Sequence, residues 1–315
     1  MQIGIIGAGM AGLCAADLLV GQGHTVTLFD KGRAAGGRLS TRRVDDGHWQ
    51  FDHGAPWFSA RDEGFIAAMT QWEKRGVVAR WPNPDGQHWV GVPGMNALVR
   101  HVAEGHDVRF GVQITSLLHA GDWWLNAGDK PYGPFDAILL ALPAEQAALL
   151  AGLYDFNMAR VAASVRSVPV WTGMFAFDRI LAAPDVISAK GGIDLALRNG
   201  AKPGRGGGET WVVHATSQWS AQHLEDAAED VAGALLSQFG DMVDDALPKP
   251  VFMQAHRWRF ALPSDNPAST QFALWNPQIQ LGACGDWLGG NGVEAAWLSG
   301  RALATRMLEG WRKGA

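Results

Sequence analysis

Two hydrophobic patterns follow each other at the start of the chain. Residues 3–6, IGII, form a short apolar run that predicts a buried strand, and residues 13–20 carry apolar side chains at helical spacing. A second apolar run over residues 25–29 predicts another strand, which ends at Asp30. Strand, glycine turn, helix and strand in this order predict the beginning of a Rossmann-like α/β fold.

The remaining apolar patterns predict a mixture of helices and strands. We expect helices directly after Pro143 and over residues 65–75, 95–103, 221–239 and 293–308. We expect strands over residues 49–51, 108–118, 123–127, 137–142, 168–178, 209–217 and 279–284. Clusters of Pro, Gly and Asn predict a turn over residues 81–88 and a loop or hairpin tip over residues 199–209.

The order of these elements predicts two domains in one chain of 315 residues. Dinucleotide-binding segments lie at the start, middle and end, and the longer alternating strands lie between them. We therefore expect a discontinuous, glutathione-reductase-type FAD-binding domain of residues 1–65, 90–147 and 271–315. An inserted α+β substrate domain would then comprise residues 66–89 and 148–270.

The glycine turn has the spacing of a dinucleotide site, Gly7-x-Gly9-x-x-Gly12. The first glycine permits a tight turn, the second lets the backbone approach a pyrophosphate, and the third lets helix and strand pack closely. Asp30 follows Gly12 by 18 residues, where an acidic side chain can bind a ribose hydroxyl. The motif alone leaves open a nicotinamide dinucleotide, a flavin dinucleotide or a purely structural turn.

Composition excludes several classes of protein. A net charge of −5 argues against a general nucleic-acid binder, because phosphate contacts need a basic face. Two cysteines, Cys14 and Cys284, are too few for a disulfide framework or a zinc site. The sequence contains no apolar stretch near 18 residues and no basic segment before the first apolar run, so we expect a cytoplasmic protein that binds no membrane.

Several further segments resemble the FAD-binding motifs of the flavin amine oxidase and desaturase superfamily. They are RAAGGRLST (residues 33–41), DHGA (52–55), VPGM (92–95), ALP (141–143), and GD with GVE (285–286 and 292–294). Within that superfamily, FDKGRAAGGRLSTRR, FDHGAPWF and AHRWRFALP are similar to the bacterial renalases. This resemblance implies a flavoprotein oxidoreductase with non-covalent FAD. It would oxidise misreduced 2- or 6-dihydro isomers of NAD(P)H to NAD(P)+ and pass the electrons to O2, giving H2O2.

The resemblance also implies which residues hold the FAD. The glycine turn and helix start would bind pyrophosphate, Asp30 the ribose, Arg38 a phosphate, and the backbone of Val112 the adenine. Asp286 would lie near the pyrophosphate or ribityl chain, with a turn or helix-cap aspartate as the alternative. The full set is Gly7, Gly9, Met10, Ala11, Gly12, Asp30, Lys31, Gly37, Arg38, His53, Gly54, Ala55, Val112, Gly285, Asp286, Gly292 and Val293.

Substrate contacts are expected from the segment His256-Arg257-Trp258-Arg259. Alternation along a strand places His256 and Trp258 on one face and the two arginines on the other. We expect His256, Trp258, Arg259 and Trp171 to position the substrate, with packing in the core or solvation as the alternative. Trp211 and Trp287 are weaker candidates for the pocket wall. A dihydropyridine becomes aromatic on losing a hydride, so no obligate catalytic base is expected, and no metal motif is visible.

Three other functions remain open. Many flavin amine oxidases carry a lysine that holds a water near the flavin, on a strand of the inserted lobe, but residues 166–178 contain no lysine. A desaturase or protoporphyrinogen-oxidase-like activity needs a large lipophilic tunnel, for which the chain leaves little room. A non-enzymatic dinucleotide sensor would use the same fold only to bind.

Overall fold

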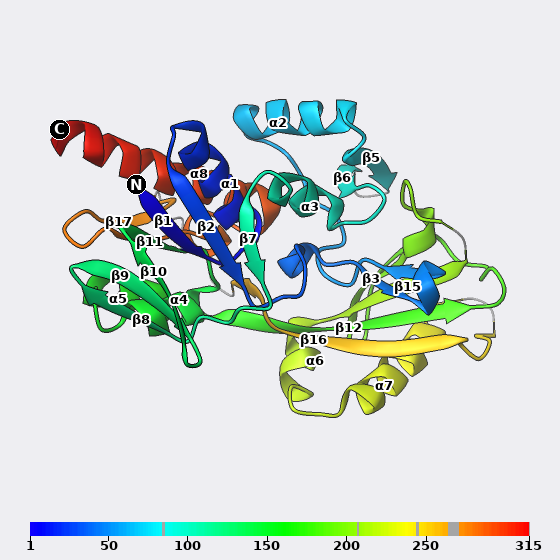
Figure 1. The fold of residues 1–315 in the computed structure, drawn as a ribbon. Coiled ribbons are helices and arrows are strands. Elements are labelled where there is room, and N and C mark those ends of the chain that lie inside the picture. The colour runs from blue at the N-terminus through cyan, green and yellow to red at the C-terminus, as the bar shows by residue number, and fades with distance from the viewer. Residues whose placement is uncertain (84–85, 207, 244–245, 264–270, 315) are drawn as a thin grey trace.

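The computed structural model describes residues 1–83, 86–206, 208–243, 246–263 and 271–314 (Figure 1). Its largest sheet has six strands in the order β17 (Leu274–Asn276), β18 (Leu281–Ala283), β11 (Ala137–Leu140), β1 (Gln2–Ile6), β2 (Thr25–Asp30) and β7 (Asp107–Phe110). All neighbouring strands are parallel except β17 and β18. The mixed α/β fold with a Rossmann-like domain is therefore confirmed.

The two faces of this sheet bury different partners, because side chains alternate along a strand. Ile3 and Ile5 of β1 share a core with helices α1 (Met10–Gly21) and α8 (Gly292–Gly314). Ile6 points to the opposite face and shares a second core with Trp123 and Leu125. These two belong to β9, in a three-stranded sheet of β8 (Ser116–Ala120), β9 (Asp122–Ala127) and β10 (Lys130–Phe135).

A five-stranded antiparallel sheet forms the centre of the inserted domain. Its strand order is β13 (Val186–Lys190), β14 (Ile193–Arg198), β15 (Glu209–Ala215), β12 (Ser167–Phe177) and β16 (Phe252–Pro263). Helices α6 (Ser217–Gln222) and α7 (Ala228–Gly240) cover one face, below the long strands in Figure 1. The opposite face meets the hairpin of β3 (Arg42–Val44) and β4 (Trp49–Phe51).

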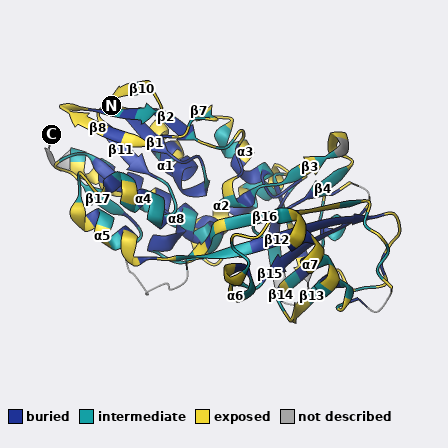
Figure 2. Ribbon diagram, turned by 90° about the horizontal axis from the view of Figure 1, so that it is seen from below, coloured by how far each residue is buried: buried dark blue, intermediate teal, exposed yellow. Residues whose placement is uncertain are grey.

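Side chains of β12 alternate between the two faces of the sheet, and both faces carry apolar, buried side chains. Phe175 and Phe177 pack with Phe239 of α7, whereas Met174 and Ala176 pack with Phe51 of β4. Figure 2 shows β12 and β15 as largely buried strands between these layers. The inserted sheet is thus held directly against the hairpin that continues into the DHGA segment.

The remaining elements lie around the two sheets. They are η1 (Gly37–Leu39), η2 (Asp45–Gly47), α2 (Glu63–Lys74), β5 (Val78–Asn83), β6 (Gly86–Gly91), α3 (Ala97–Ala103), α4 (Ala144–Ala151), α5 (Phe156–Ser164), η3 (Asn199–Ala201) and η4 (Asp286–Leu288). Within the described ranges, no helix combines the length and the apolar composition needed to cross a membrane.

Three predicted elements differ from the structure. Residues 108–118 are not one strand: β7 ends at Phe110, Gly111 has a φ of +71°, and β8 begins at Ser116 in another sheet. The helix expected over residues 221–239 is interrupted between α6 and α7. The turn expected over residues 81–88 is the tip of the β5–β6 hairpin, and residues 84–85 of that turn lie outside the described part of the chain.

The expected domain division also needs correction. In the described part of residues 66–89, strand β5 pairs with β6 and not with the inserted sheet. Met69 and Trp89 lie in one core cluster with Leu13 and Leu303. Helices α4 and α5 likewise share a core with β11 of the six-stranded sheet. Packing therefore joins residues 66–89 and 148–164 to the cofactor sheet. Residues 264–270, at the expected end of the insertion, lie outside the described residues.

Candidate flavin site and its substrate face

The glycine turn between β1 and α1 has the geometry that a dinucleotide requires. Gly7 has a φ of +105°, and a Cβ there would lie 2.2 Å from the carbonyl oxygen of Ala141. A Cβ on Gly12 would lie 2.0 Å from the carbonyl oxygen of Gly7, so helix and strand approach as closely as glycine allows. A Cβ on Gly9 would meet nothing within 4 Å, which leaves the second glycine open to a pyrophosphate.

Asp30, at the end of β2, braces this turn from the neighbouring strand. Its carboxylate accepts hydrogen bonds from the backbone N–H groups of Ala8, at 2.8 Å, and Gly32, at 2.7 Å. Lys31 follows it at an exposed position. The N–H of Val112 donates to the carbonyl oxygen of Asp30 at 2.9 Å, so it is engaged within the fold and not free for an adenine.

The GGR and DHGA segments lie together, as the resemblance implied. The N–H of Ala55 donates to the carbonyl oxygen of Arg38 at 2.8 Å, and a Cβ on Gly54 would lie 2.1 Å from that oxygen. Gly37, directly before Arg38, has a φ of +53°. The Arg38 guanidinium donates to Oδ1 of Asp286 at 2.7 Å and to the carbonyl oxygen of Ala261 at 3.1 Å.

Asp286 therefore connects the last strand of the cofactor sheet to the second segment of the site. Its carboxylate is almost fully buried, and its carbonyl oxygen accepts from the N–H of Gly290 in the turn before α8. The preceding Gly285 has no room for a side chain, since a Cβ would lie 2.4 Å from Nε1 of Trp287. Asp286 thus has a turn role and an Arg38 contact at the same time.

Helix α8 begins at the edge of this site. Gly292 has a φ of +89°, and a Cβ there would meet nothing within 4 Å. Val293 is buried, and the carboxylate of Glu294 accepts from the N–H groups of Arg61 and Asp62, both at 2.6 Å. Met10 and Ala11 are also buried, and Gly300 of α8 packs against the backbone of Ala11. The start of α1 therefore packs closely against the body of α8.

These residues fit a flavin dinucleotide. Gly9 and Gly292 each face open space at a helix N-terminus, where free N–H groups and the helix dipole favour negative charge. The pyrophosphate and the electron-rich pyrimidine ring of a flavin are the two groups that such positions suit. The flavin would supply the redox chemistry, and the chain would bind it and orient its partner.

Three aromatic side chains form the face of the inserted sheet beside the DHGA segment. The His53 ring centroid lies 4.9 Å from that of His256 and 5.3 Å from that of Trp258, whose Nε1–H donates to the carbonyl oxygen of His53 at 2.7 Å. Burial first, then the positive charge of Arg42, lowers the pKa of His256 to about 4. Burial, His256 and Arg42 lower the pKa of His53 to about 3, so both imidazoles are neutral near pH 7.

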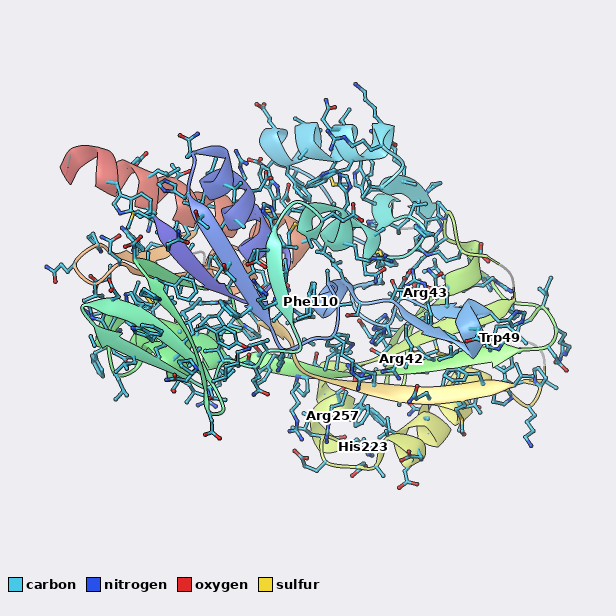
Figure 3. All side chains as sticks on the ribbon, in the orientation of Figure 1. Arg42, Arg43, Trp49, Phe110, His223 and Arg257 are labelled. Atoms are coloured by element: carbon cyan, nitrogen blue, oxygen red, sulfur yellow. The ribbon has the colours of Figure 1, made fainter. Side chains whose placement is uncertain are left out.

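Trp171 and Arg259 do not lie on this face, which corrects their expected substrate role. The indole N–H of Trp171 donates to the carbonyl oxygen of His223 at 2.9 Å, inside the core under α6 and α7. Arg259 forms a two-pronged salt bridge with Glu225, at 2.7 and 2.8 Å. In Figure 3, Arg42 lies above the long strands while Arg257 and His223 lie below them, which shows the two faces directly.

Trp211 and Trp287 are core residues. Trp211 lies under α7, and its Nε1–H donates to Glu209 at 2.8 Å. Trp287 donates to the carbonyl oxygen of Leu142 at 3.0 Å and packs beneath the cofactor sheet. Both tryptophans therefore pack in the core and do not line the pocket wall.

The sequence did not indicate a buried charge cluster behind His53. The carboxylate of Asp52 accepts from Arg205 Nε at 3.0 Å and from Arg205 Nη2, and it lies 3.4 Å from Lys202 Nζ. All three side chains are at most 1% exposed. Both cations come from the glycine-rich segment expected to be a loop or hairpin tip, and only their tertiary contacts bury them.

His214 and Thr172 were also missed. The Thr172 hydroxyl lies 3.3 Å from Nδ1 of His214 in the neighbouring strand, and Nε2 of His214 has no hydrogen-bond partner. Burial first, then the charges of Lys202 and His53, lowers the pKa of His214 to about 3. One signal was present: in ETWVVHATS, His214 shares a strand face with the apolar Val212.

The chain belongs to the flavin-containing amine oxidoreductase family. The family model matches residues 80–308, well over half of the chain, and a model of the NAD(P)-binding Rossmann-like domain matches residues 5–71. A flavin cofactor follows from this membership. The family thereby defines the class of protein, an oxidoreductase, and leaves its substrate open.

Solved structures share the fold over the whole chain. A candidate protoporphyrinogen oxidase from Exiguobacterium sp. 255-15 has a TM-score of 0.78 at 12% identity, covering 98% of this chain and 99% of its own. Putrescine oxidase bound to putrescine has a TM-score of 0.72 at 12% identity, with the same coverage. Cyclohexylamine oxidase from Brevibacterium oxydans IH-35A has a TM-score of 0.70 at 13% identity, covering 99% of each chain.

Two curated relatives match short stretches of the chain. L-amino-acid oxidase from Trimeresurus stejnegeri is 51% identical over 45 residues, which is 14% of this chain and 9% of that protein. A 4,4'-diapophytoene desaturase from Staphylococcus aureus (strain Newman) is 44% identical over 54 residues, which is 17% of this chain and 10% of that protein. The chain thus spans about a tenth of the length of these relatives, and they carry no information on its substrate.

Proposed function

We propose that the protein is a renalase-like oxidase that binds FAD non-covalently and oxidises 2- or 6-dihydro isomers of NAD(P)H to NAD(P)+. The substrate carbon releases a hydride and the pyridine ring becomes aromatic. The flavin accepts the two electrons, and O2 takes them up with two protons, giving H2O2.

The observation that carries this proposal is the charge of the substrate face. Strands β12 and β16 contain no acidic residue, and Glu209, the acid of β15, alternates onto the opposite face with Trp211. In the neighbouring segments, Asp52 and Asp286 are each paired with cations. On β12, β15 and β16, and at the adjoining Asp52 and Asp286, the described residues therefore offer no free carboxylate to a cationic amine on this face.

An anionic dinucleotide meets better conditions at the same place. Arg42 lies on this face, where its guanidinium donates to the side chain of Gln254, and it lowers the pKa of both His53 and His256. A guanidinium suits the phosphates of a dinucleotide, whereas it repels an alkylammonium group. Neutral imidazoles and the Trp258 indole would pack against an uncharged dihydropyridine ring without requiring a proton transfer.

Non-covalent attachment is supported by the two cysteines. Cys14 and Cys284 are both buried, and burial raises the pKa of the Cys284 thiol to about 12 and that of Cys14 still further. A thiol that stays protonated is a poor nucleophile. Neither cysteine is therefore suited to forming a bond to the flavin.

Amine oxidation is the second candidate, because the family model is that of flavin-containing amine oxidoreductases and two fold neighbours are amine oxidases. Identity of 12–13% limits that likeness to the fold. The two candidates differ in the charge of the substrate, so one experiment separates them.

The deciding experiment is anaerobic stopped-flow measurement of flavin absorbance in the purified holoprotein. The protein is mixed separately with a preparation of 2- and 6-dihydronicotinamide dinucleotide isomers, with ordinary NADPH, and with putrescine and cyclohexylamine. We expect rapid bleaching by the isomers alone, reversed by air with formation of peroxide. Bleaching by an amine instead would overturn the proposal in favour of an amine oxidase, and bleaching by none would favour a dinucleotide sensor.

A further inference from the structure

The charges buried beneath the substrate face do not balance. Asp52 carries one negative charge, whereas Lys202 and Arg205, both in contact with it, carry two positive charges. Arg205 is well satisfied, since its Nη1 also donates to the carbonyl oxygens of Gly91, at 2.5 Å, and Pro203, at 2.7 Å. Among the described residues, Lys202 Nζ has one hydrogen-bond contact, at 3.4 Å to Asp52, and it lies 5.7 Å from the centroid of the Trp81 ring. Lys202 is therefore the unbalanced cation.

Among the residues that the structure describes, no second acidic group pairs with this cluster. The other oxygen of Asp52 accepts from the hydroxyl of Thr41, at 2.7 Å, and from the N–H of Met95, at 3.0 Å, both uncharged donors. Arg43, which interacts with Arg205 and with Arg100, adds to the positive potential around the cluster. Within the described parts of the chain, no carboxylate other than Asp52 forms an ion pair with any of these four cations.

The cluster lies directly behind the candidate site. Asp52 precedes His53, whose ring contacts His256 and Trp258, and Ala55 of the same segment is hydrogen-bonded to Arg38. On the sheet side, Lys202 acts electrostatically on His214, next to Thr172. Nδ1 of His53 and Nε2 of His214 are both buried without a hydrogen-bond partner. These side chains are buried, so the field of an extra charge is weakly screened.

We propose that Lys202 is a positioning residue whose ammonium provides the positive potential that lets this face hold an anion against the flavin. The inference rests on the flavin part of the proposed function and is independent of which substrate is oxidised. The ligand is a small anion or an anionic ring system at the flavin. Lys202 acts through the field and not by contact, because its side chain is fully buried.

The charge of Lys202 depends on pH in an accessible range. Burial lowers its pKa, Asp52 raises it and Arg205 lowers it further, leaving it at about 8. Below that pH the lysine is protonated and the cluster has its excess positive charge. Above it the cluster is neutral, and an anion should lose its advantage.

Sulfite is a suitable probe, because it is a small anion that adds to oxidised flavin and bleaches its visible absorbance without any substrate. The experiment titrates sulfite into FAD-loaded wild type, Lys202→Met, Lys202→Arg and the control Lys190→Met. Lys190 lies on the edge strand β13, where it donates to the carbonyl oxygen of Asp241. FAD content and thermal unfolding are measured for every variant.

We expect Lys202→Met to bind sulfite about tenfold more weakly than wild type, as the loss of one buried charge predicts. Lys202→Arg should retain the affinity, and Lys190→Met should match wild type. After correction for the protonation of sulfite itself, the wild-type affinity should fall as pH rises through about 8, and Lys202→Met should lack this step.

Equal sulfite affinity in wild type and Lys202→Met would overturn the proposal. Loss of FAD from Lys202→Met would leave the decision to the wild-type pH profile and to Lys202→Arg: a profile without a step near pH 8, or an arginine variant that binds weakly, would also overturn it. The dihydronicotinamide proposal is separate, since it fails or stands on substrate bleaching alone.

Discussion

Gly12 is the residue at which the backbone of α1 comes closest to the glycine turn. A Cβ there would lie 2.0 Å from the carbonyl oxygen of Gly7 and 3.0 Å from the Cβ of Ala141. The first obstacle is backbone and not a flexible side chain, so neither partner can move aside cheaply. The site therefore depends on positions without a side chain as much as on functional groups.

Gly12→Ala should therefore lower the free energy of unfolding by about 3 kcal/mol and reduce FAD retention, because the turn must open to admit the methyl group. Denaturant unfolding and the flavin content after purification would measure both effects. Gly233→Ala is the matched control, since Gly233 lies in the helix α7 with nothing within 4 Å of its added Cβ. That variant should gain about 0.5–1 kcal/mol. Equal behaviour of the two variants would contradict the assigned role of Gly12.

Strand β16 divides two kinds of chemistry between its faces. His256 and Trp258 face the DHGA segment, where they meet His53, whereas Arg257 and Arg259 face α6 and reach Glu225. The register with β12 fixes this division, because Thr172 pairs with His256 and Trp171 pairs with Arg257. Successive residues of β16 therefore point alternately to the substrate face and to the outer face.

Neighbouring substitutions on β16 test that division. Trp258→Ala should slow anaerobic flavin reduction by about tenfold or more while FAD stays bound. The reason is that the dihydropyridine ring of the substrate loses the indole that packs against it and orients it toward the flavin. Arg259→Ala removes only an exposed salt bridge to Glu225 and should leave the reduction rate unchanged. Stopped-flow traces of both variants with the same substrate give the comparison. A slow Arg259→Ala with a normal Trp258→Ala would reverse our assignment of the two faces.

Three buried or half-buried histidines lie where the inserted sheet meets the cofactor domain, and the folded protein keeps all three neutral. His53, His214 and His256 come from two strands of the inserted sheet and from the DHGA segment of the cofactor domain. Burial lowers the pKa of each, to about 3, 3 and 4. The folded protein therefore resists protons that the unfolded chain accepts below the ordinary histidine pKa of 6.5.

Stability should consequently be constant between about pH 6.5 and 8, where the folded and unfolded chains bind equal numbers of protons at these histidines and at Lys202, and fall as the pH decreases toward 4. Each of the three histidines contributes up to about 1.4 kcal/mol per pH unit in that window. Burial raises the pKa of Asp52, but Lys202 and Arg205 lower it more and leave it at about 2. Protonation of Asp52 therefore affects stability only at lower pH. Denaturant unfolding at a series of pH values would measure the slope. His214→Phe should reduce the slope of the unfolding free energy against pH. His119→Gln, at an exposed position, should leave that slope unchanged.

Local patterns determined the cofactor half of this protein. A short apolar run, three glycines at fixed spacing and an acidic residue after the next strand specify a turn whose geometry depends on backbone space alone. The alternation in AHRWRFALP likewise determined which side chains of β16 share a face, because a strand has a strict period of two. Sequence was sufficient wherever the interaction lies within one element or one turn.

Tertiary structure alone decided which face of β16 meets the cofactor segments and which polar groups become buried. Alternation already placed Arg259 on the face opposite Trp258, but only the packing of α6 and α7 shows that this face, with Trp171 on the neighbouring strand, lies away from the cofactor segments. Lys202 and Arg205 lie in a glycine-rich segment that resembles a solvated loop, yet they are fully buried against Asp52, 150 and 153 residues away. The physical reason is that burial and charge pairing depend on segments distant in the chain, whose approach no local pattern encodes.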